Sequence, residues 1–147
     1  MQNLKDVAED PTQRQALVED IHQLIGRRVD AVRGLSGMAI RGGYKVVSKM
    51  RGGRMIPSAV NTMLDAFCAA LDPFVDAFRE DGGDSFARFL KGKESQVSNA
   101  LLSITDARAE RANPLLQRPY KKLRGFGEAQ VEAAVPEIAD IVQRAVS

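Results

Sequence analysis

The chain has 147 residues, the size of one ordinary domain, and 44% of them are apolar, which excludes a chain that is disordered throughout. Its net charge of +2 is too small for a uniformly basic polyanion binder. The single cysteine, Cys68, excludes an internal disulfide, and the single histidine, His22, excludes a metal site built from several histidines.

The first residues, MQNLKDVAEDP, lack the apolar run of a signal peptide. No other stretch is apolar for long enough to cross a membrane, so we expect a cytoplasmic protein. We interpret residues 1–11 as a flexible N-terminal arm and residues 12–147 as a single all-helical domain. Thr12 suits the N-cap of the first helix, which is predicted to continue to about Val32.

Residues 34–57 read GLSGMAIRGGYKVVSKMRGGRMIP, and on a helical wheel their apolar side chains cover more than half of the circumference. Cations such as Arg41 and Lys45 occupy only a narrow strip. Because such a helix is typical of a buried position, we predict that residues 36–51 form the central helix of the domain. Gly42 and Gly43 lie in or beside the apolar arc, where the absence of a Cβ lets a neighbouring helix approach closely.

The rest of the chain predicts further helices, and no run alternates in the manner of a strand. These elements are a helix from Pro57 that breaks or kinks at Asp72 and Pro73, a short helix capped by Asp84, a helix over 93–111, a short helix after Asn113 interrupted at Pro119, a turn at 125–127, and a last helix over 128–146 kinked near Pro136. The predicted fold class is therefore all-α: a single-domain multi-helix bundle with a central glycine-containing helix.

Four segments resemble a known family: LVEDIHQLI, GLSGMAIRGGYKVV, IPSAVNTML and LLSITDARAE. They are similar to a group of small all-helical actinobacterial proteins known only as a domain of unknown function. The resemblance covers residues 17 to about 142, and GLSGMAIRGGYK is its most specific element. It implies a soluble helical protein, and it implies no activity, cofactor or catalytic residue.

No catalytic motif stands out. The chain has no GxSxG nucleophile elbow, no HExxH zinc motif and no EF-hand loop. His22 fits a partly exposed helical position, and Cys68 lies in an apolar stripe where it fits a small buried hydrophobe better than a reactive thiol. We therefore expect a protein that is not an enzyme and has no cofactor or metal, although an activity without a readable motif stays open.

A basic ridge is the leading candidate for a binding surface. It starts near the expected helix N-terminus, where free backbone N–H groups favour anions. Its candidate residues are Arg33, Ser36, Arg41, Lys45, Lys49, Arg51 and Arg54. We expect it to meet an anionic partner, such as an acidic protein surface, a phosphate-bearing ligand or a headgroup. The alternative is a solvated face that balances the acidic residues 65–84 within the same fold.

Other functions stay open. A bundle enclosing an apolar, lipid-like ligand is suggested by soft and aromatic side chains, namely Met38, Met50, Met55, Met63, Phe67, Phe74 and Phe78. Weak nucleic-acid binding is suggested by Arg-Gly-Gly at residues 41–43 and 51–53 and by a GxxG element at residues 34–37, but the folds that carry such motifs are missing, so nucleic acid is an unlikely partner. The partner itself is unknown, and a homo-oligomer is possible.

Overall fold

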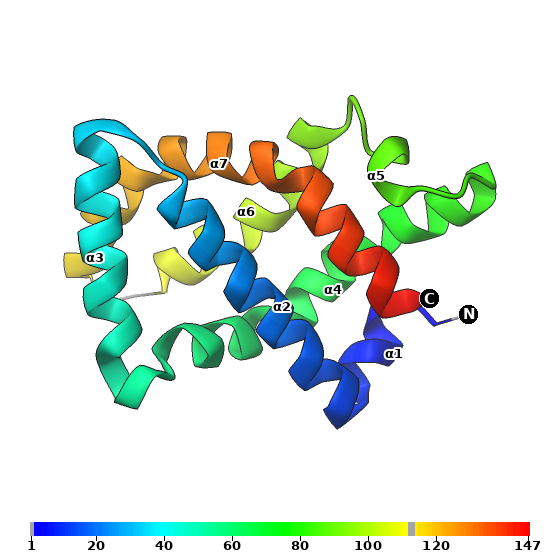
Figure 1. Cartoon of the computed structure of the whole chain (residues 1–147), viewed down its shortest axis with the longest axis horizontal. Helices are drawn as coiled ribbons and strands as arrows, with labels where there is room; N and C mark the ends of the chain where they lie inside the picture. Colours follow the sequence, from blue (N-terminus) through cyan, green and yellow to red (C-terminus); the bar gives the residue numbers. More distant parts are fainter. Residues whose placement is uncertain (1, 112–113) are drawn as a thin grey trace.

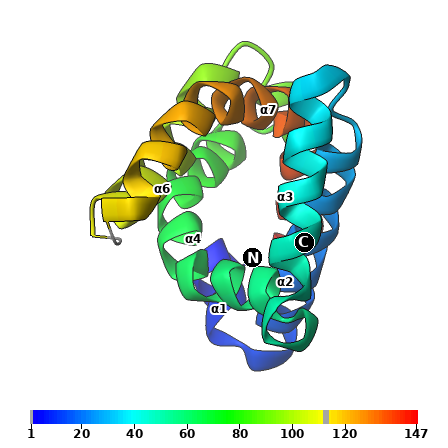
Figure 2. The same cartoon turned by 90° about the vertical axis from the view of Figure 1, so that its left-hand side faces the viewer.

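The computed structural model describes residues 2–111 and 114–147, and all of their side chains except those of residues 36, 115, 116, 118, 119, 122 and 123. The described residues form helices and no strand, which confirms the predicted all-α single-domain bundle. The helices are α1 (Leu4–Glu9), α2 (Pro11–Asp30), α3 (Gly34–Gly53), α4 (Met55–Asp81), α5 (Phe86–Phe89), α6 (Glu94–Glu110) and α7 (Pro114–Val146). Figure 1 shows their arrangement, and Figure 2 shows α2 and α3 facing α4 and α6 across a ring that α7 closes at the top.

The hydrophobic core is built from every described helix except α3. Helix α4 contributes the longest buried stripe, which repeats at helical spacing as expected from the sequence: Val60, Leu64, Cys68, Leu71 and Val75. Leu64 of α4 and Val97 of α6 are 0% exposed, and Phe86 of α5 is 1% exposed. Phe78, Phe86 and Phe89 form an aromatic cluster where α4 meets α5, with ring centroids 5.2 to 6.4 Å apart.

Helix α1 occupies the place where a flexible arm was expected. Leu4 and Val7 are each 1% exposed, so this segment is part of the core. The backbone N–H groups of Leu4 and Lys5 donate to the carboxylate of Asp72 in α4 at 2.7 and 3.1 Å. The prediction of a loose arm is therefore wrong for this segment. Asn3 and Asp6 form a capping box at the start of its helix, and a carboxylate 68 residues further along the chain accepts from its first N–H groups.

Three predicted interruptions are absent: the helix break at Asp72 and Pro73, the interruption at Pro119 and the turn at residues 125–127. Helix α4 runs through Pro73, and Asp72 caps α1 instead of starting a new helix. Because Leu71 and Val75 are buried on either side, core packing offsets the hydrogen bond that the proline removes. Helix α7 likewise continues through residues 125–127, where a turn was expected.

The sequence is closer to the structure at the other helix boundaries. Ser85, not Asp84, caps α5, since its side chain accepts from the Arg88 N–H at 3.2 Å. Figure 1 shows α7 changing direction between its orange and red parts, the region that contains Pro136. The cap expected at Asn113 lies outside the described residues.

Helix α3 forms where the central helix was predicted, but it stands at one edge of the molecule (Figures 1 and 2). In the described structure it contacts α2 and α4, its neighbours along the chain, and no other helix. Leu35 is 85% exposed and Val46 is 67% exposed. A Cβ at Gly42 or Gly43 would meet nothing within 4 Å. The prediction that neighbouring helices wrap this segment is therefore wrong, and its paired glycines make no close helix contact with the described part of the chain.

The close backbone approach in α3 lies instead at Gly37. A Cβ there would sit 2.5 Å from the carbonyl oxygen of Val32, at the turn between α2 and α3. The N-cap of α3 is Arg33, without a side-chain capping bond, and Ser36 lies within the first turn, so the predicted capping role of Ser36 is wrong. The side chain of Ser36 is outside the described part of the structure. At the other end the helical conformation stops at Met50, and Arg51 adopts a φ of 53°.

Candidate functional site

A cavity of about 420 Å³ lies between the helices and is partly open to solvent. Six helices contribute to its wall: α1, α2, α3, α4, α6 and α7. The wall is almost entirely aliphatic or aromatic, with Leu24 and Ile25 from α2, Leu64 and Phe67 from α4, Leu101 from α6 and Ile138 from α7 among its side chains. This volume falls within the range of small-molecule binding pockets, and the wall chemistry suits an apolar ligand.

The outermost wall is supplied by α3 through a single side chain, Ile40. Ile40 and Tyr44 are half-buried, and they lie on the face of α3 that is turned toward the body of the protein. Helix α3 thus contributes one side chain to the cavity wall, and its outer face is exposed.

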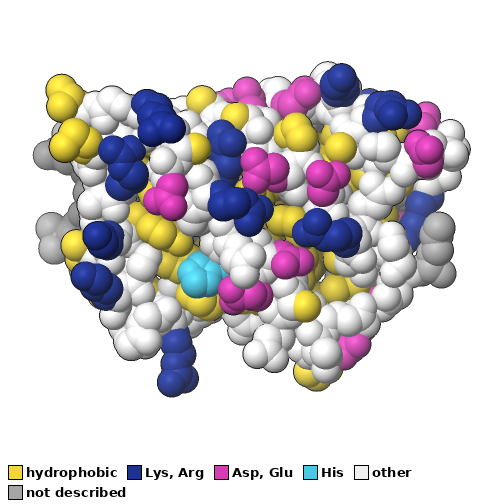
Figure 3. Space-filling view, viewed as in Figure 1, with side chains coloured by type: hydrophobic (Ala, Val, Ile, Leu, Met, Phe, Trp, Pro, Cys, Tyr) yellow, Lys and Arg dark blue, Asp and Glu magenta, His cyan; other side chains and the backbone are white. Residues whose placement is uncertain are grey.

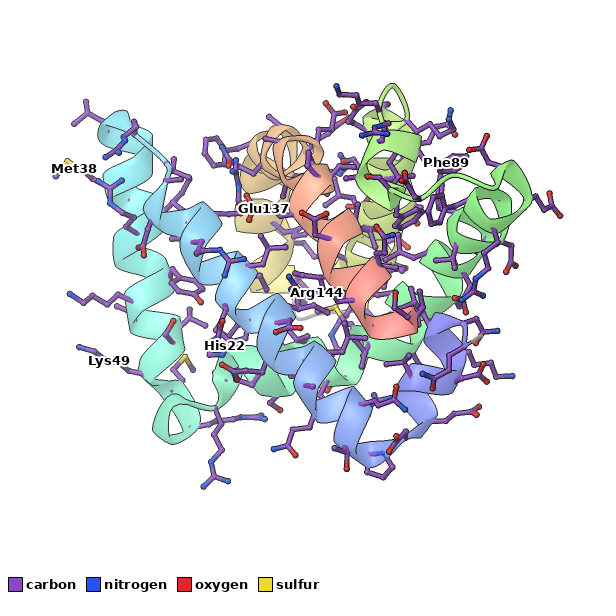
Figure 4. All side chains as sticks on the ribbon, turned by 45° about the vertical axis from the view of Figure 1, so that its right-hand side comes forward. His22, Met38, Lys49, Phe89, Glu137 and Arg144 are labelled. Atoms are coloured by element: carbon purple, nitrogen blue, oxygen red, sulfur yellow. The ribbon has the colours of Figure 1, made fainter. Side chains whose placement is uncertain are left out.

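Arg28 lies in the cavity wall, whose surface is almost wholly apolar, and its guanidinium is held by residues of α7. Its Nη2 donates to Oε1 of Gln130 at 3.1 Å, and Gln130 also lines the cavity. Its Nη1 lies 3.6 Å from the carboxylate of Glu137, which also pairs with Arg27 at 3.6 Å. Figure 4 shows Glu137 on α7, at the side facing α2. The Nε of Arg28 is buried and has no hydrogen-bond partner within the described residues. A buried donor of this kind is costly unless something accepts from it.

Thr105 is a third polar residue in the wall, after Arg28 and Gln130, and it belongs to a network that joins α6 to α7. The hydroxyl of Tyr120 lies 2.8 Å from that of Thr105 and donates to Asp106, and Arg124 holds the same carboxylate at 3.1 Å. The hydrogen bonds from Arg124 and Tyr120 lower the pKa of Asp106. Burial, followed by the bond to Asp106, raises the pKa of Tyr120. This network fixes two walls of the cavity relative to each other.

Cys68 lines the cavity and is 3% exposed. Burial, and then the negative charges of Asp72 and Asp65, raise its pKa to about 11. Its thiol is therefore protonated at neutral pH, in agreement with its reading as a small buried hydrophobe. His22 is part-exposed, with its Nδ1 3.8 Å from Glu19.

The predicted basic ridge is an extended strip and not a pocket. Arg33 stands before the first turn of α3 and Arg54 after its last, so about 25 Å of helix separates the two ends. Lys45 and Lys49 lie one turn apart and are exposed, and Figure 4 shows Lys49 pointing away from the body. Arg41 is turned inward and donates to the carbonyl oxygen of Val32.

The acidic residues 65–84 form no ion pair with this strip in the described part of the chain. Among the described residues, none of the strip's cations forms an ion pair, whereas Asp65 pairs with Arg14 at 2.8 Å. Figure 3 shows the blue cations gathered over α3 and the end of α2, with the magenta carboxylates mainly over the rest of that face. The view of the ridge as a face balanced by those carboxylates is therefore not supported by the contacts of the described side chains.

The apolar residues proposed from the sequence as a ligand lining are mostly elsewhere. Of these seven, Phe67 alone lines the cavity; Met38 and Met50 are exposed on α3, and Phe78 belongs to the aromatic cluster. The residues that sequence reasoning missed, Arg28 and Gln130, lie 102 positions apart. No local pattern marks them, because only the packing of α2 against α7 brings them together.

Two searches of the described residues gave no site. No helix is long and apolar enough to span a membrane. No group of three or more His, Cys, Asp or Glu side chains is placed to hold a metal ion.

Fold and site together define a class: an all-α bundle with an apolar internal cavity. More particularly, the chain belongs to a family of unknown function, DUF6918, whose model matches residues 4–146. This confirms the resemblance seen in the sequence. Comparisons with curated proteins and with solved structures found no match.

Proposed function

We propose that this protein is a non-enzymatic binding protein whose cavity holds one amphiphile with an apolar chain and an oxygen-bearing head. The observation that carries the proposal is the cavity of about 420 Å³ with an almost wholly apolar wall. Arg28 is among its lining residues, and the Nε of this side chain is buried without a hydrogen-bond partner among the described residues. An apolar chain would fill the aliphatic part. A carboxylate or ester oxygen would accept from Arg28.

The energetics favour a filled cavity. Its wall is almost wholly apolar, and covering apolar surface with an apolar chain is favourable by about 25 cal/mol per Å² removed from water. A ligand that binds only the folded chain also stabilises it against unfolding.

Titration with a fluorescent long-chain fatty acid tests the role of Arg28. The variant Arg28→Met keeps the apolar stem and removes the donor, so we expect the Kd to rise about tenfold or more. The matched control is Arg27→Met, which removes the other partner of Glu137 at the same 3.6 Å distance but does not line the cavity. Its Kd should stay within about twofold of the unmodified chain.

Two results would contradict the proposal. Equal weakening by Arg27→Met and Arg28→Met would mean that general charge, and not the cavity donor, sets the affinity. The proposal would also be contradicted if the unmodified chain bound neither the fatty acid nor the corresponding alcohol or alkane, because the cavity would then hold no ligand of this kind.

A further inference from the structure

We infer that the outer face of α3 is a docking surface for an anionic membrane leaflet. The first observation is where the described structure leaves large apolar side chains exposed. All five such residues belong to this one helix: Leu35, Met38, Val46, Val47 and Met50, which are 36% to 85% exposed. An apolar patch that is concentrated on one element marks an interaction surface, whereas exposed apolar residues scattered singly do not.

The positions of these residues form a face. At 100° per residue, Leu35, Met38 and Val46 fall on the same side of α3, and Lys45 and Lys49 fall beside Met38. Figure 4 shows Met38 and Lys49 pointing away from the body. Both lysines thus lie at one edge of the apolar stripe. A helix with an apolar face and adjacent lysines is the pattern of a helix that lies in a membrane interface, with its apolar side chains in the acyl region and its cations at the headgroups.

The charge around this face selects an anionic occupant. Between Asp30 and Asp65 the sequence contains six cations, Arg33, Arg41, Lys45, Lys49, Arg51 and Arg54, and no carboxylate. A second copy of the chain docked through the same face would bring two such sets of cations together, which is unfavourable. The cations are spread along about 25 Å of helix, which suits an extended anionic sheet of headgroups better than one phosphate.

The position of α3 beside the cavity is compatible with membrane docking, although the docking inference does not rest on it. Its inner face carries Ile40, part of the cavity wall, and its outer face is the one proposed to meet the membrane. A membrane-docked α3 would place the cavity next to the phase where acyl amphiphiles reside. The docking inference itself rests on the exposed face and its charge, and it stands or falls separately from the cavity ligand.

Vesicle co-sedimentation tests the inference. The unmodified chain should bind vesicles of equimolar phosphatidylcholine and phosphatidylglycerol, bind phosphatidylcholine vesicles far less, and be released by salt. The variant Lys45→Gln/Lys49→Gln should reduce the partition coefficient roughly 25-fold, about fivefold for each cation. Met38→Ser/Val46→Ser should also abolish most binding. Because all four side chains are exposed, far-UV circular dichroism should show unchanged folding.

The matched control is Lys5→Gln/Lys91→Gln, which removes the same net charge from exposed sites outside α3. It should bind like the unmodified chain. Binding lost equally in this control would show attraction by net charge alone and would overturn the inference. Absence of binding to the anionic vesicles would overturn it as well.

Two further outcomes would assign the face to another occupant and overturn the inference. One is a dimer in sedimentation velocity that Met38→Ser/Val46→Ser converts to a monomer, with no vesicle binding. The other is binding to soluble poly-glutamate as strong as to vesicles and unaffected by that variant. The cavity-filling variant Ala134→Phe should leave vesicle binding unchanged. The vesicle experiment therefore tests membrane docking independently of ligand binding in the cavity.

The chain contains no tryptophan, which allows a direct readout of insertion. In Met38→Trp, the single indole should shift its emission to shorter wavelength when anionic vesicles are added. In Ala77→Trp, which places the indole at an exposed site on α4, the emission should stay unchanged. The same shift in both variants would contradict docking through α3.

Discussion

Single residues in this protein carry roles that their type alone does not reveal. The two adjacent glycines of α3 stand in open space, whereas Gly37 sits against the Val32 carbonyl. Arg28 and Arg27 are neighbours in sequence and share Glu137, yet only Arg28 lines the cavity. Each distinction depends on what surrounds the residue in space, which the sequence does not show.

For the glycines of α3 we predict that alanine substitutions change the free energy of unfolding in opposite directions. Gly42→Ala and Gly43→Ala should each raise the free energy of unfolding by up to about 0.5–1 kcal/mol, because alanine is the better helix former and its Cβ meets nothing. Gly37→Ala should lower it by about 1–3 kcal/mol, because its Cβ would collide with backbone. Urea unfolding of the three variants checks this. A stabilising Gly37→Ala would contradict the packing described for the α2–α3 turn.

At the scale of the helices, the sequence predicts which segments are helical better than it predicts where each helix lies in the fold. Most helices after α1 begin and end close to their predicted places, because amphipathic spacing and caps are local signals. The position of α3 could not be predicted in the same way. A helix that is apolar around most of its circumference fits a buried core and a membrane interface equally well, and composition alone does not distinguish them.

The cap of α1 by Asp72 is a long-range contact that can be tested. Asp72→Ala removes the acceptor of the Leu4 and Lys5 N–H groups, so we expect a loss of about 1–2 kcal/mol in the free energy of unfolding. Amide hydrogen exchange should also become faster in α1. The control is Asp76→Ala, an exposed carboxylate one turn further along α4. If both variants unfold at the same urea concentration as the unmodified chain, α1 does not depend on this cap.

The network between α6 and α7 predicts a pH dependence. Arg124 and Tyr120 lower the pKa of Asp106 below its ordinary value of 3.8, so the ionised carboxylate stabilises the folded state above that pH. This stabilisation is lost as the pH falls through the lowered pKa. Asp106→Asn should therefore reduce the Tm at pH 7, and the difference from the unmodified chain should shrink at about pH 3 and below. A difference in Tm that is independent of pH would contradict the assigned role of this carboxylate.

At the scale of the whole molecule, the helices share a hydrophobic core and also enclose an apolar cavity. Sequence reasoning proposed an enclosed apolar ligand but placed six of its seven lining residues elsewhere. Those residues were chosen because Met and Phe side chains are adaptable. The residues of the cavity wall depend instead on which faces of the six helices point toward one another. The basic residues of α3 could be read from the sequence, but their separation into an inward-turned Arg41 and an exposed strip could not.

A larger side chain in the cavity wall tests whether the cavity is empty space in the folded chain. Ala134 of α7 is 4% exposed and lines the cavity, so Ala134→Phe places a ring in the empty space and should maintain or raise the Tm. The control Ala133→Phe puts the same ring on the exposed side of α7. If Ala134→Phe lowers the Tm of ligand-free protein by much more than the control does, the site is already packed and no cavity of this size exists.

The most direct measurement of ligand binding is native mass spectrometry of the chain and these two variants, purified without detergent and then incubated with a long-chain fatty acid. We expect the unmodified chain and Ala133→Phe to carry one additional small-molecule mass that organic extraction removes, and Ala134→Phe to carry none. The ligand-free mass alone for the unmodified chain, both as purified and after incubation, would contradict the account.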